Sequence, residues 1–345
     1  MVASNRRGSN FIPAVGNFSV QYNFTSASAA ASFLNDPQYL GFPLYREPAW
    51  SRDFTSAAVF LGAMLGMLTM GRLGDTMGRL RAMQITLLLT VLGALIPGCA
   101  VGTDDWVYGT VLGGRLVLGV GVGGIYPLSA VSSAEECKDW SEKGRHVAFA
   151  FFWQTIGQVT PYFVAMLLLV LQPTTPAEWV PQLQFRLLFA LGAVPAVVVL
   201  LASFHAADSE EFREQQNRMA LSFDRRVLTT LLGTAGSWCL YDLAFYGTTL
   251  FTPTILERMC MTGEFQDGHC HQTLQQTFLQ SAMTSAMGIP GCLCAVLLAD
   301  RMGCKRLNIY GFLLLSLNFA ALAVVWRLAP GARVWHFAPR PLHEV

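Results

Sequence analysis

A carboxylate stands between two aromatic residues in the apolar segment SWCLYDLAFYGTTL, residues 237–250. Trp238, Asp242 and Tyr246 recur every four residues, so a helix would place them on one face over about 12 Å. An indole N–H and a phenol O–H can donate hydrogen bonds to an anion, and the carboxylate can accept a hydroxyl donor or carry a proton. Either aromatic residue alone would be interpreted as a packing residue. With Asp242 between them, the spacing favours a binding site.

The elements that would position this face are membrane-spanning helices. Of the 345 residues, 53% are hydrophobic and 13% are charged, whereas soluble domains carry about 25% charged residues. A spanning helix needs about 20 mostly apolar residues. The first predicted span, residues 11–34, is rich in Asn, Gln, Ser and Thr but uncharged, which is typical of a helix that faces a polar cavity. The nine predicted spans are 11–34, 55–71, 83–103, 107–131, 147–171, 183–204, 228–252, 273–299 and 307–326.

Basic residues are distributed unevenly between the two sides of the predicted membrane. Before the C-terminal tail, fifteen Lys and Arg residues lie in segments on the side of the N-terminus, and four lie in loops on the other side. Because cytoplasmic loops carry the excess of basic residues, the N-terminus is predicted to be cytoplasmic. We expect a multi-pass integral membrane protein, located in the plasma membrane.

One polar stretch divides the helices into two groups. Residues 205–226, HAADSEEFREQQNRMALSFDRR, are charged, poor in aromatic residues and follow the sixth span. The sequence therefore predicts an all-α polytopic membrane protein with two bundles, of which the second is partial. The expected domains are a six-helix bundle over 1–204, a cytoplasmic linker over 205–227, a partial bundle of three helices over 228–326 and an aberrant tail over 327–345.

Two loops on the predicted cytoplasmic side share a sequence pattern. GRLGDTMGRLRAM (71–83) and LADRMGCKRLNIYG (298–311) both contain Asp, then a polar or basic residue, Met, Gly and a basic cluster. They lie six spans apart, which indicates the internal repeat of parallel-repeat transporters. The glycines would allow close helix approach, and Asp75 could cap a helix or pair with a basic neighbour; a role in membrane topology alone is the alternative. The residues of interest are Gly71, Asp75, Gly78, Arg79, Asp300, Gly303, Lys305 and Arg306.

An arginine lies inside the fourth span, in GGRLVLGVGVGGIYPLSAV (113–131). A charge at this depth costs about 3 kcal/mol on insertion scales and marks a candidate functional site. Alternatively, Arg115 could reach the membrane interface or pair with a loop carboxylate such as Asp75. The glycines that follow it would let neighbouring helices pack backbone to backbone.

The loop pattern Gly71-x-Leu73-x-Asp75-x-x-Gly78-Arg79-x-Arg81 resembles the signature between helices two and three of the major facilitator superfamily. The fourth span, with Arg115 followed by several glycines, resembles the fourth-helix motif of that superfamily. The resemblance implies the two-bundle major facilitator fold. It also implies that the loop cluster latches the two bundles together in the outward-open state.

Within that superfamily, the sequence is similar to the phosphate:proton symporters. The similar stretches are GGIYPLS on the fourth span, AFAFFWQTIGQ on the fifth, and the Trp–Asp–Tyr pattern on the seventh. The resemblance implies alternating-access transport of inorganic phosphate or a related small anion. The substrate and the lipid bilayer are then the expected partners, with no cofactor, metal or nucleic acid. The implied phosphate ligands are Tyr126, Gln154, Trp238, Asp242 and Tyr246.

Two departures from these symporters bear on proton coupling. Ile125 occupies the position of an aspartate on their fourth helix, and Val20 and Asn23 replace acidic residues on their first helix. Because Asn23 cannot titrate, Arg115 lacks a charged partner from that helix. Asp242 and Arg115 are the remaining candidates for proton coupling. A facilitator or differently coupled carrier, and a carrier of a sugar or another organic solute, are the open alternatives.

The segment RLAPGARVWHFAPRPLHEV, which follows the ninth span, contains no further span. Members of the superfamily have twelve spans, so we expect a truncated chain that cannot complete alternating access; a transport-dead homologue is a third alternative. An enzyme is not expected, because no Ser/His/Asp or metal-binding constellation gathers in one place. The eight cysteines lack metal-site spacing, and a disulfide between Cys260 and Cys270 in their shared loop is left open.

Overall fold

The computed structural model describes residues 11–36, 39–135, 143–173, 176–206, 225–249, 252–253, 256, 264–266 and 269–328. These ranges are largely helical, with one short antiparallel hairpin of two strands. The first helices are α1 (Phe11–Asn35), α2 (Ser51–Met77), α3 (Arg79–Gly98), α4 (Asp104–Glu135), α5 (Lys143–Val170), α6 (Trp179–Leu191) and α7 (Ala193–Ser203). The later elements are α9 (Arg225–Thr249), β1 (Glu264–Gln266), β2 (His269–His271), α11 (Leu274–Ala286), α12 (Gly288–Met302) and α13 (Cys304–Leu328).

Every predicted span falls on a helix of the structure. The sixth span is divided into α6 and α7 at Gly192, and the eighth into α11 and α12 at Met287. In the described part of the chain, six helical segments are long and apolar enough to cross a membrane. The helices α1, α9 and α13 have 25 residues each, which also suffices for a hydrocarbon core of about 30 Å.

Three sequence predictions fall on residues that the structure does not describe. Most of the predicted linker, residues 207–224, lies outside the described ranges, as does nearly all of the predicted tail, 329–345. Cys260 also lies outside them, and with it the disulfide considered for Cys260 and Cys270. The proposed domain boundaries therefore stay predictions.

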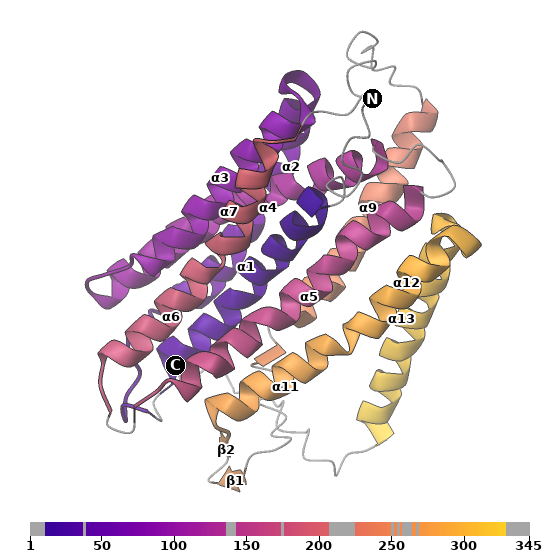
Figure 1. Cartoon of the computed structure of the whole chain (residues 1–345). Coiled ribbons are helices and arrows are strands. Elements are labelled where there is room, and N and C mark those ends of the chain that lie inside the picture. The colour runs from indigo at the N-terminus through magenta and orange to yellow at the C-terminus, as the bar shows by residue number, and fades with distance from the viewer. Residues whose placement is uncertain are drawn as a thin grey trace.

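The first six spans pack against one another in one bundle (Figure 1). Helix α4 packs along both α2 and α3, whereas α1 packs along α5, and α6 and α7 lie beside α1 and α3. One buried apolar cluster joins α1, α2, α3, α4 and α7, and a second joins α1, α4, α5 and α6 to α11. The polar residues Asn17, Gln21 and Asn23 of α1 are buried in this bundle.

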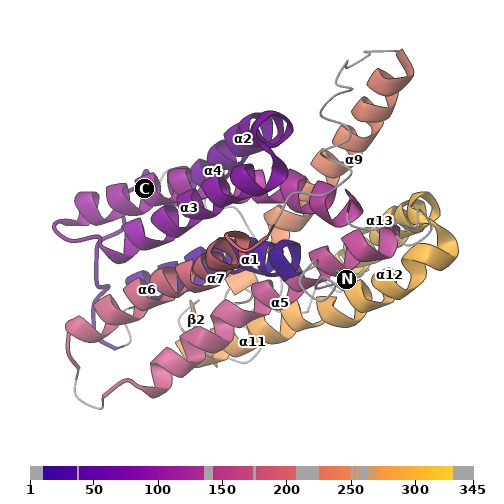
Figure 2. The same ribbon diagram turned by 45° about the horizontal axis from the view of Figure 1, so that its top comes forward.

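The later helices pack mainly against α5. Helices α11 and α12 lie along α5, and α13 packs against α12 (Figure 1). Phe278 of α11 is fully buried, with its ring centroid 5.2 Å from that of Phe33 in α1. The first turns of α9 extend away from the other helices (Figure 2), and the residues of these turns are exposed. The last turns of α9 reach the first bundle.

The two loop motifs form the same turn. Gly78 separates α2 from α3 with φ 105°, and Gly303 separates α12 from α13 with φ 78°. Glycine adopts these left-handed φ values without steric cost, whereas a residue with a Cβ atom would be strained. Each glycine follows an aspartate by three residues, so the structure reproduces the internal repeat that the sequence indicates.

The contact between α4 and α2 joins their backbones directly. A Cβ atom on Gly119 would lie 2.3 Å from the carbonyl oxygen of Val59, and one on Gly123 would lie 2.2 Å from that of Ala63. No side chain fits at either position, so the glycines set the distance between the two helices. The close packing predicted for the fourth span is confirmed.

We predict that Gly123→Ala destabilises the protein and that Gly113→Ala on the same helix does not. The methyl group at position 123 would overlap the Ala63 carbonyl, and such overpacking costs about 1–3 kcal/mol. Nothing lies within 4 Å of a Cβ atom at Gly113. The thermal unfolding midpoints of both purified variants in one detergent provide the measurement. Equal midpoints would mean that this contact does not hold α2 against α4.

Candidate functional site

The five residues predicted to bind substrate line one cavity of about 580 Å³. Tyr126 comes from α4, Gln154 from α5, and Trp238, Asp242 and Tyr246 from α9. Residues of α12 and α13 line another side of the cavity. The cavity therefore lies where the first bundle meets the later helices.

Two tyrosines connect α4 to α9 at this cavity. The hydroxyl oxygens of Tyr126 and Tyr246 are 2.5 Å apart, and either group can be the donor. The Tyr246 ring centroid lies 5.0 Å from that of Phe24 and 5.2 Å from that of Phe60. The ring of Trp238 meets that of Tyr126 edge-on at 6.3 Å. Aromatic contacts of this kind are directional, so they fix the face of α9 that points into the cavity.

Asp242 supplies the charge in this cavity, since no other described residue that lines it is charged. Its side chain is partly exposed and lies on the helix face that also carries Trp238 and Tyr246. The amide nitrogen of Gln154 is buried and has no hydrogen-bond partner in the described part of the chain. The cavity thus combines several donors with one carboxylate acceptor. This combination suits a small oxyanion that carries hydroxyl groups.

Other polar residues of the cavity were not identified from the sequence. They are Thr155, Gln158, Ser237, Tyr241, Cys292 and Asn308. Gln158 carried a usable signal, because it follows Gln154 by four residues and a helix places both on one face. Cys292 and Asn308 lie on α12 and α13, where no local pattern marks them. The hydroxyl of Thr155 donates to the Cys292 sulfur at 3.1 Å, which joins α5 to α12.

Arg115 is not among the residues that line this cavity. Its side chain is 2% exposed, and Nη1 donates to the carbonyl oxygen of Asn23 at 2.7 Å. Its guanidinium carbon lies 6.0 Å from the centroid of the Phe24 ring. The alternatives considered for Arg115 are therefore wrong: its side chain is buried beside α1 and does not reach the interface, and Asp75 pairs with Arg79. Helix α1 contacts Arg115 through a carbonyl and a ring instead of a carboxylate.

Asn23 has a structural role that the sequence did not predict. Its Nδ2 donates to the carbonyl oxygen of Ser19 at 2.8 Å and to that of Gly192 at 3.0 Å. Gly192 lies at the break between α6 and α7, so Asn23 joins α1 to this break. A carboxylate at position 23 has no proton for these carbonyls when ionised. The neutral residue is therefore matched to its surroundings.

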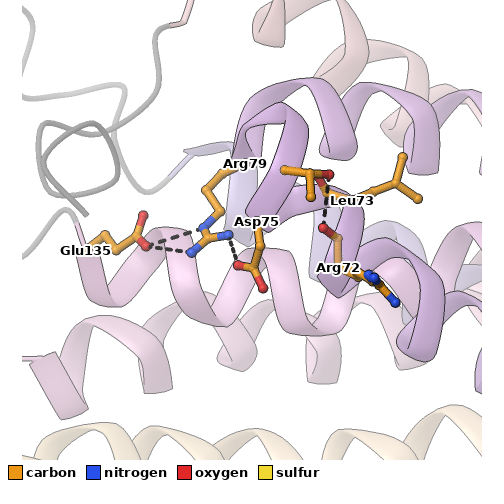
Figure 3. Close-up of polar contacts among 6 residues, drawn as sticks. Arg72, Leu73, Asp75, Arg79 and Glu135 are labelled. Carbon is orange, nitrogen blue, oxygen red and sulfur yellow. Dashed lines mark hydrogen bonds and ion pairs between the residues drawn. The ribbon is translucent and has the colours of Figure 1, made fainter. Parts of the chain in front are cut away.

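Arg79 lies between two carboxylates at the ends of three helices (Figure 3). It pairs with Asp75 at the end of α2, and its Nη2 lies 3.2 Å from Oε1 of Glu135 at the end of α4. Asp75 thus pairs with a basic neighbour, as expected, and it does not cap α3, whose N-terminus has no side-chain cap. The cluster holds together the ends of α2, α3 and α4.

The expectation of close packing at Gly71 is wrong. A Cβ atom at Gly71 would have no atom within 4 Å, whereas one at Gly74 would lie 2.6 Å from Cδ2 of Leu128. The close approach of α2 to α4 near the loop is therefore made one turn later, at Gly74.

The second loop motif contributes an ion pair between the two groups of helices. Nε of Arg145, near the start of α5, lies 3.3 Å from Oδ2 of Asp300, near the end of α12. Lys305 and Arg306 are exposed in the first turn of α13. This pair is a charged contact between α5 and α12.

Comparison with known proteins identifies related sequences. Residues 9–237 match the family described as Sugar (and other) transporter. The chain is 33% identical over 333 residues to the inorganic phosphate transporter PT2 of Toxoplasma gondii, covering 94% of this chain and 56% of that protein. It is 27% identical to the probable inorganic phosphate transporter 1-6 of Arabidopsis thaliana, covering 91% of this chain and 71% of that protein. The chain thus spans little more than half the length of the Toxoplasma relative.

The fold is also similar to that of solved structures. The xylose transporter XylE from E. coli, in a partially occluded inward-open conformation, matches with a TM-score of 0.62 and 17% identity. The match covers 95% of this chain and 78% of XylE. At this identity the similarity concerns the fold alone. It confirms the predicted all-α, two-bundle fold class with a partial second bundle, to which the chain adds the short β1–β2 hairpin.

We predict that Arg145 and Asp300 are coupled in stability. The side chains are 46% and 23% exposed, so the coupling energy should be about 0.2–1 kcal/mol. Arg145→Asp and Asp300→Arg should each destabilise the protein, and the double variant should recover part of the loss. A double-mutant cycle on the unfolding free energy measures this coupling. The control cycle pairs Asp300→Arg with Arg225→Asp, at an exposed position of α9, and should be additive; additivity in both cycles would contradict the prediction.

Proposed function

We propose that this chain, which belongs to the Sugar (and other) transporter family of major facilitators, transports inorganic phosphate or a related small anion by alternating access. The match to this family confirms the predicted superfamily, and the related proteins are transporters. The chain is accordingly a polytopic membrane protein of a transporter family. The substrate, the coupling and the transport cycle belong to the proposal, since the chain spans 56% of the Toxoplasma relative.

The observation that carries the substrate proposal is the position of Asp242 beside several hydrogen-bond donors in one cavity. Monobasic phosphate presents charged oxygens, which need donors, and hydroxyl groups, which need an acceptor. The phenols, the indole and the Gln154 amide supply donors, and Asp242 can accept a phosphate hydroxyl. The names of the two relatives, both inorganic phosphate transporters, support the same substrate.

Asp242 is also the proposed carrier of a coupled proton. An ionised carboxylate repels an anion strongly in a cavity of low dielectric constant. Protonation of Asp242 therefore favours phosphate binding, and its deprotonation favours release. Arg115, the other candidate for proton coupling, does not line this cavity. Asp242 is therefore the candidate that can contact the substrate directly.

Two charged clusters are the proposed gating elements at the cytoplasmic ends of the helices. Among the described residues, the ion pairs of Arg79 with Asp75 and Glu135 lie within the first bundle, so these two pairs can remain intact while the bundles move. The Arg145–Asp300 pair connects α5 to α12 and must break when these helices separate. We therefore assign the latch to Arg145 and Asp300, and a supporting role to Asp75, Arg79 and Glu135.

The excess of basic residues on one side supports a cytoplasmic N-terminus. We propose the plasma membrane as the location, with bundles over 1–204 and 228–326 joined by a cytoplasmic linker. The small-molecule substrate and the bilayer are the proposed partners. The proposal includes no catalytic activity, cofactor, metal or nucleic acid.

A sugar or another neutral solute is the second candidate substrate. The cavity of about 580 Å³ is larger than a phosphate ion, and its wall includes Trp238, Phe151 and Phe152. Flat aromatic faces of this kind can pack against an apolar ring face. The related fold of XylE, described as a xylose transporter, is consistent with this candidate.

We predict that Asp242→Asn lowers phosphate uptake at least tenfold. The amide that replaces the carboxyl group cannot exchange a proton, so the variant loses the switch between the neutral form that binds phosphate and the charged form that releases it. An increase of about 1.4 kcal/mol in the transport barrier corresponds to this factor of ten. Labelled phosphate uptake into proteoliposomes, with and without an inward proton gradient, provides the measurement. The parent should be stimulated by the gradient and the variant should not.

Asp105→Asn is the matched control for this experiment, since Asp105 is exposed at the start of α4. Its uptake should equal that of the parent. Unchanged uptake in Asp242→Asn would refute the assignment of Asp242. Uptake of labelled xylose by a parent that does not take up phosphate would support the second candidate.

We predict that phosphate protects Cys292 from alkylation. The Cys292 thiol lines the cavity, whereas Cys239 on α9 is exposed and does not line it. Two variants of the full chain, each retaining one of these cysteines and carrying serine in place of the others, are labelled with N-ethylmaleimide. Saturating phosphate should slow labelling of Cys292 and leave that of Cys239 unchanged. Equal rates for Cys292 with and without phosphate would contradict phosphate binding in this cavity.

A further inference from the structure

A second cavity, of about 120 Å³, lies within the first bundle. It is lined by residues of α1, α2, α4 and α6 and by Glu47 in the loop between α1 and α2. No residue lines both this cavity and the one that contains Asp242. Arg115 lies on its wall and is the one basic residue among the described residues that line it.

The charge of Arg115 has no carboxylate partner among the described residues. Nη1 is bonded to a backbone carbonyl, and Nε is buried without a hydrogen-bond partner in the same residues. Buried charges are normally paired, because an isolated charge in a low-dielectric interior is costly. The ring of Phe24 faces the guanidinium at 6.0 Å but carries no charge to neutralise it.

The carboxylate that shares the cavity is held by other residues. Oε2 of Glu47 accepts from Nδ2 of Asn35 at 3.1 Å, and Oε1 accepts from Oγ of Ser51 at 3.4 Å. The hydroxyl of Tyr108 donates to Oδ1 of Asn35 at 3.0 Å, which orients the Asn35 amide towards Glu47. These contacts hold the Glu47 carboxylate beside Asn35 and Ser51.

A second donor lies on the same wall. The hydroxyl oxygen of Thr55 lines the cavity, is buried and has no hydrogen-bond partner in the described part of the chain. Arg115 and Thr55 therefore offer a charged donor and a neutral donor to one small space. An anion would satisfy both groups, whereas a water molecule would leave the charge of Arg115 unbalanced.

We infer that this cavity binds a small monovalent inorganic anion, chloride or monobasic phosphate, between Arg115 and Thr55. The volume accommodates such an ion together with water, since one water occupies about 30 Å³. The bound anion takes the part of the carboxylate that α1 lacks and neutralises the first bundle where α1, α2 and α4 meet. The inference does not depend on transport by Asp242 and extends beyond it.

The test is the thermal unfolding midpoint of the purified full chain as chloride replaces gluconate at constant ionic strength. A ligand that binds the folded state stabilises it in proportion to the logarithm of its concentration above Kd. Chloride should therefore raise the unfolding midpoint once its concentration exceeds the Kd of the site. Arg115→Gln should remove this response. An equal response in the parent and in Arg115→Gln would overturn the inference, because it would be a general salt effect.

Variants of Thr55 keep the test decisive if Arg115→Gln does not fold. Thr55→Ala should raise the half-saturating chloride concentration several-fold, because it removes one donor. Thr55→Asp supplies a fixed carboxylate beside the guanidinium and should abolish the chloride response while the protein stays folded in gluconate. Thr69→Ala, at an exposed position of the same helix, should respond as the parent does. A full chloride response in Thr55→Asp would overturn the inference.

Phosphate titrations identify the ion and separate the two cavities. They compare the parent with Arg115→Gln and Thr55→Asp, because phosphate bound in the first cavity would stabilise all three proteins equally. A midpoint that rises with phosphate and depends on Arg115 assigns phosphate to the second cavity, and a response to chloride alone assigns chloride. If neither ion acts through Arg115, the inference is wrong. That result leaves the proposal for the first cavity standing, because phosphate uptake and Cys292 protection test it separately.

Discussion

The backbone contact of α4 with α2 determines where both polar cavities lie. Gly119 and Gly123 bring α4 so close to α2 that no side chain fits between them. The same helix carries Arg115 into one cavity and Tyr126 into the other. These residues are separated by about 16 Å along the helix axis at 1.5 Å per residue. A wider spacing of the helices would move both groups away from the side chains that they meet.

Residues on a single helix could be predicted because helical spacing is a local property of the sequence. Trp238, Asp242 and Tyr246 recur every four residues, and the structure places them on one cavity. The positions of the spanning helices, although not their ends, followed from apolar length. The hairpins that turn at Gly78 and Gly303 followed from a repeated motif. In each case the structure depends on residues that are close together in the sequence, so the sequence pattern is enough to predict it.

Contacts between helices could not be predicted in this way. Tyr126 and Tyr246 are hydrogen-bonded although 120 residues separate them, and the geometry depends on how α4 meets α9. Resemblance to a family, and not spacing, brought Tyr126 and Gln154 into the candidate site. The surroundings of Arg115 could not be predicted from the sequence either. Its hydrogen-bond partner is a backbone carbonyl of α1, and every residue type has such a carbonyl.

The neutral first helix changes how charge is distributed in the bundle. Asn23 uses its amide protons to hold the carbonyls of Ser19 and Gly192, so the position that could have balanced Arg115 serves packing instead. Asp242 and Arg115 then lie in separate cavities, and neither can neutralise the other by direct contact. Each charge needs its own partner: a proton or a substrate for Asp242, and an anion for Arg115. Because Arg115 and Tyr126 share the rigid helix α4, any coupling between the two cavities must pass through the position of this helix and not through a direct ion pair.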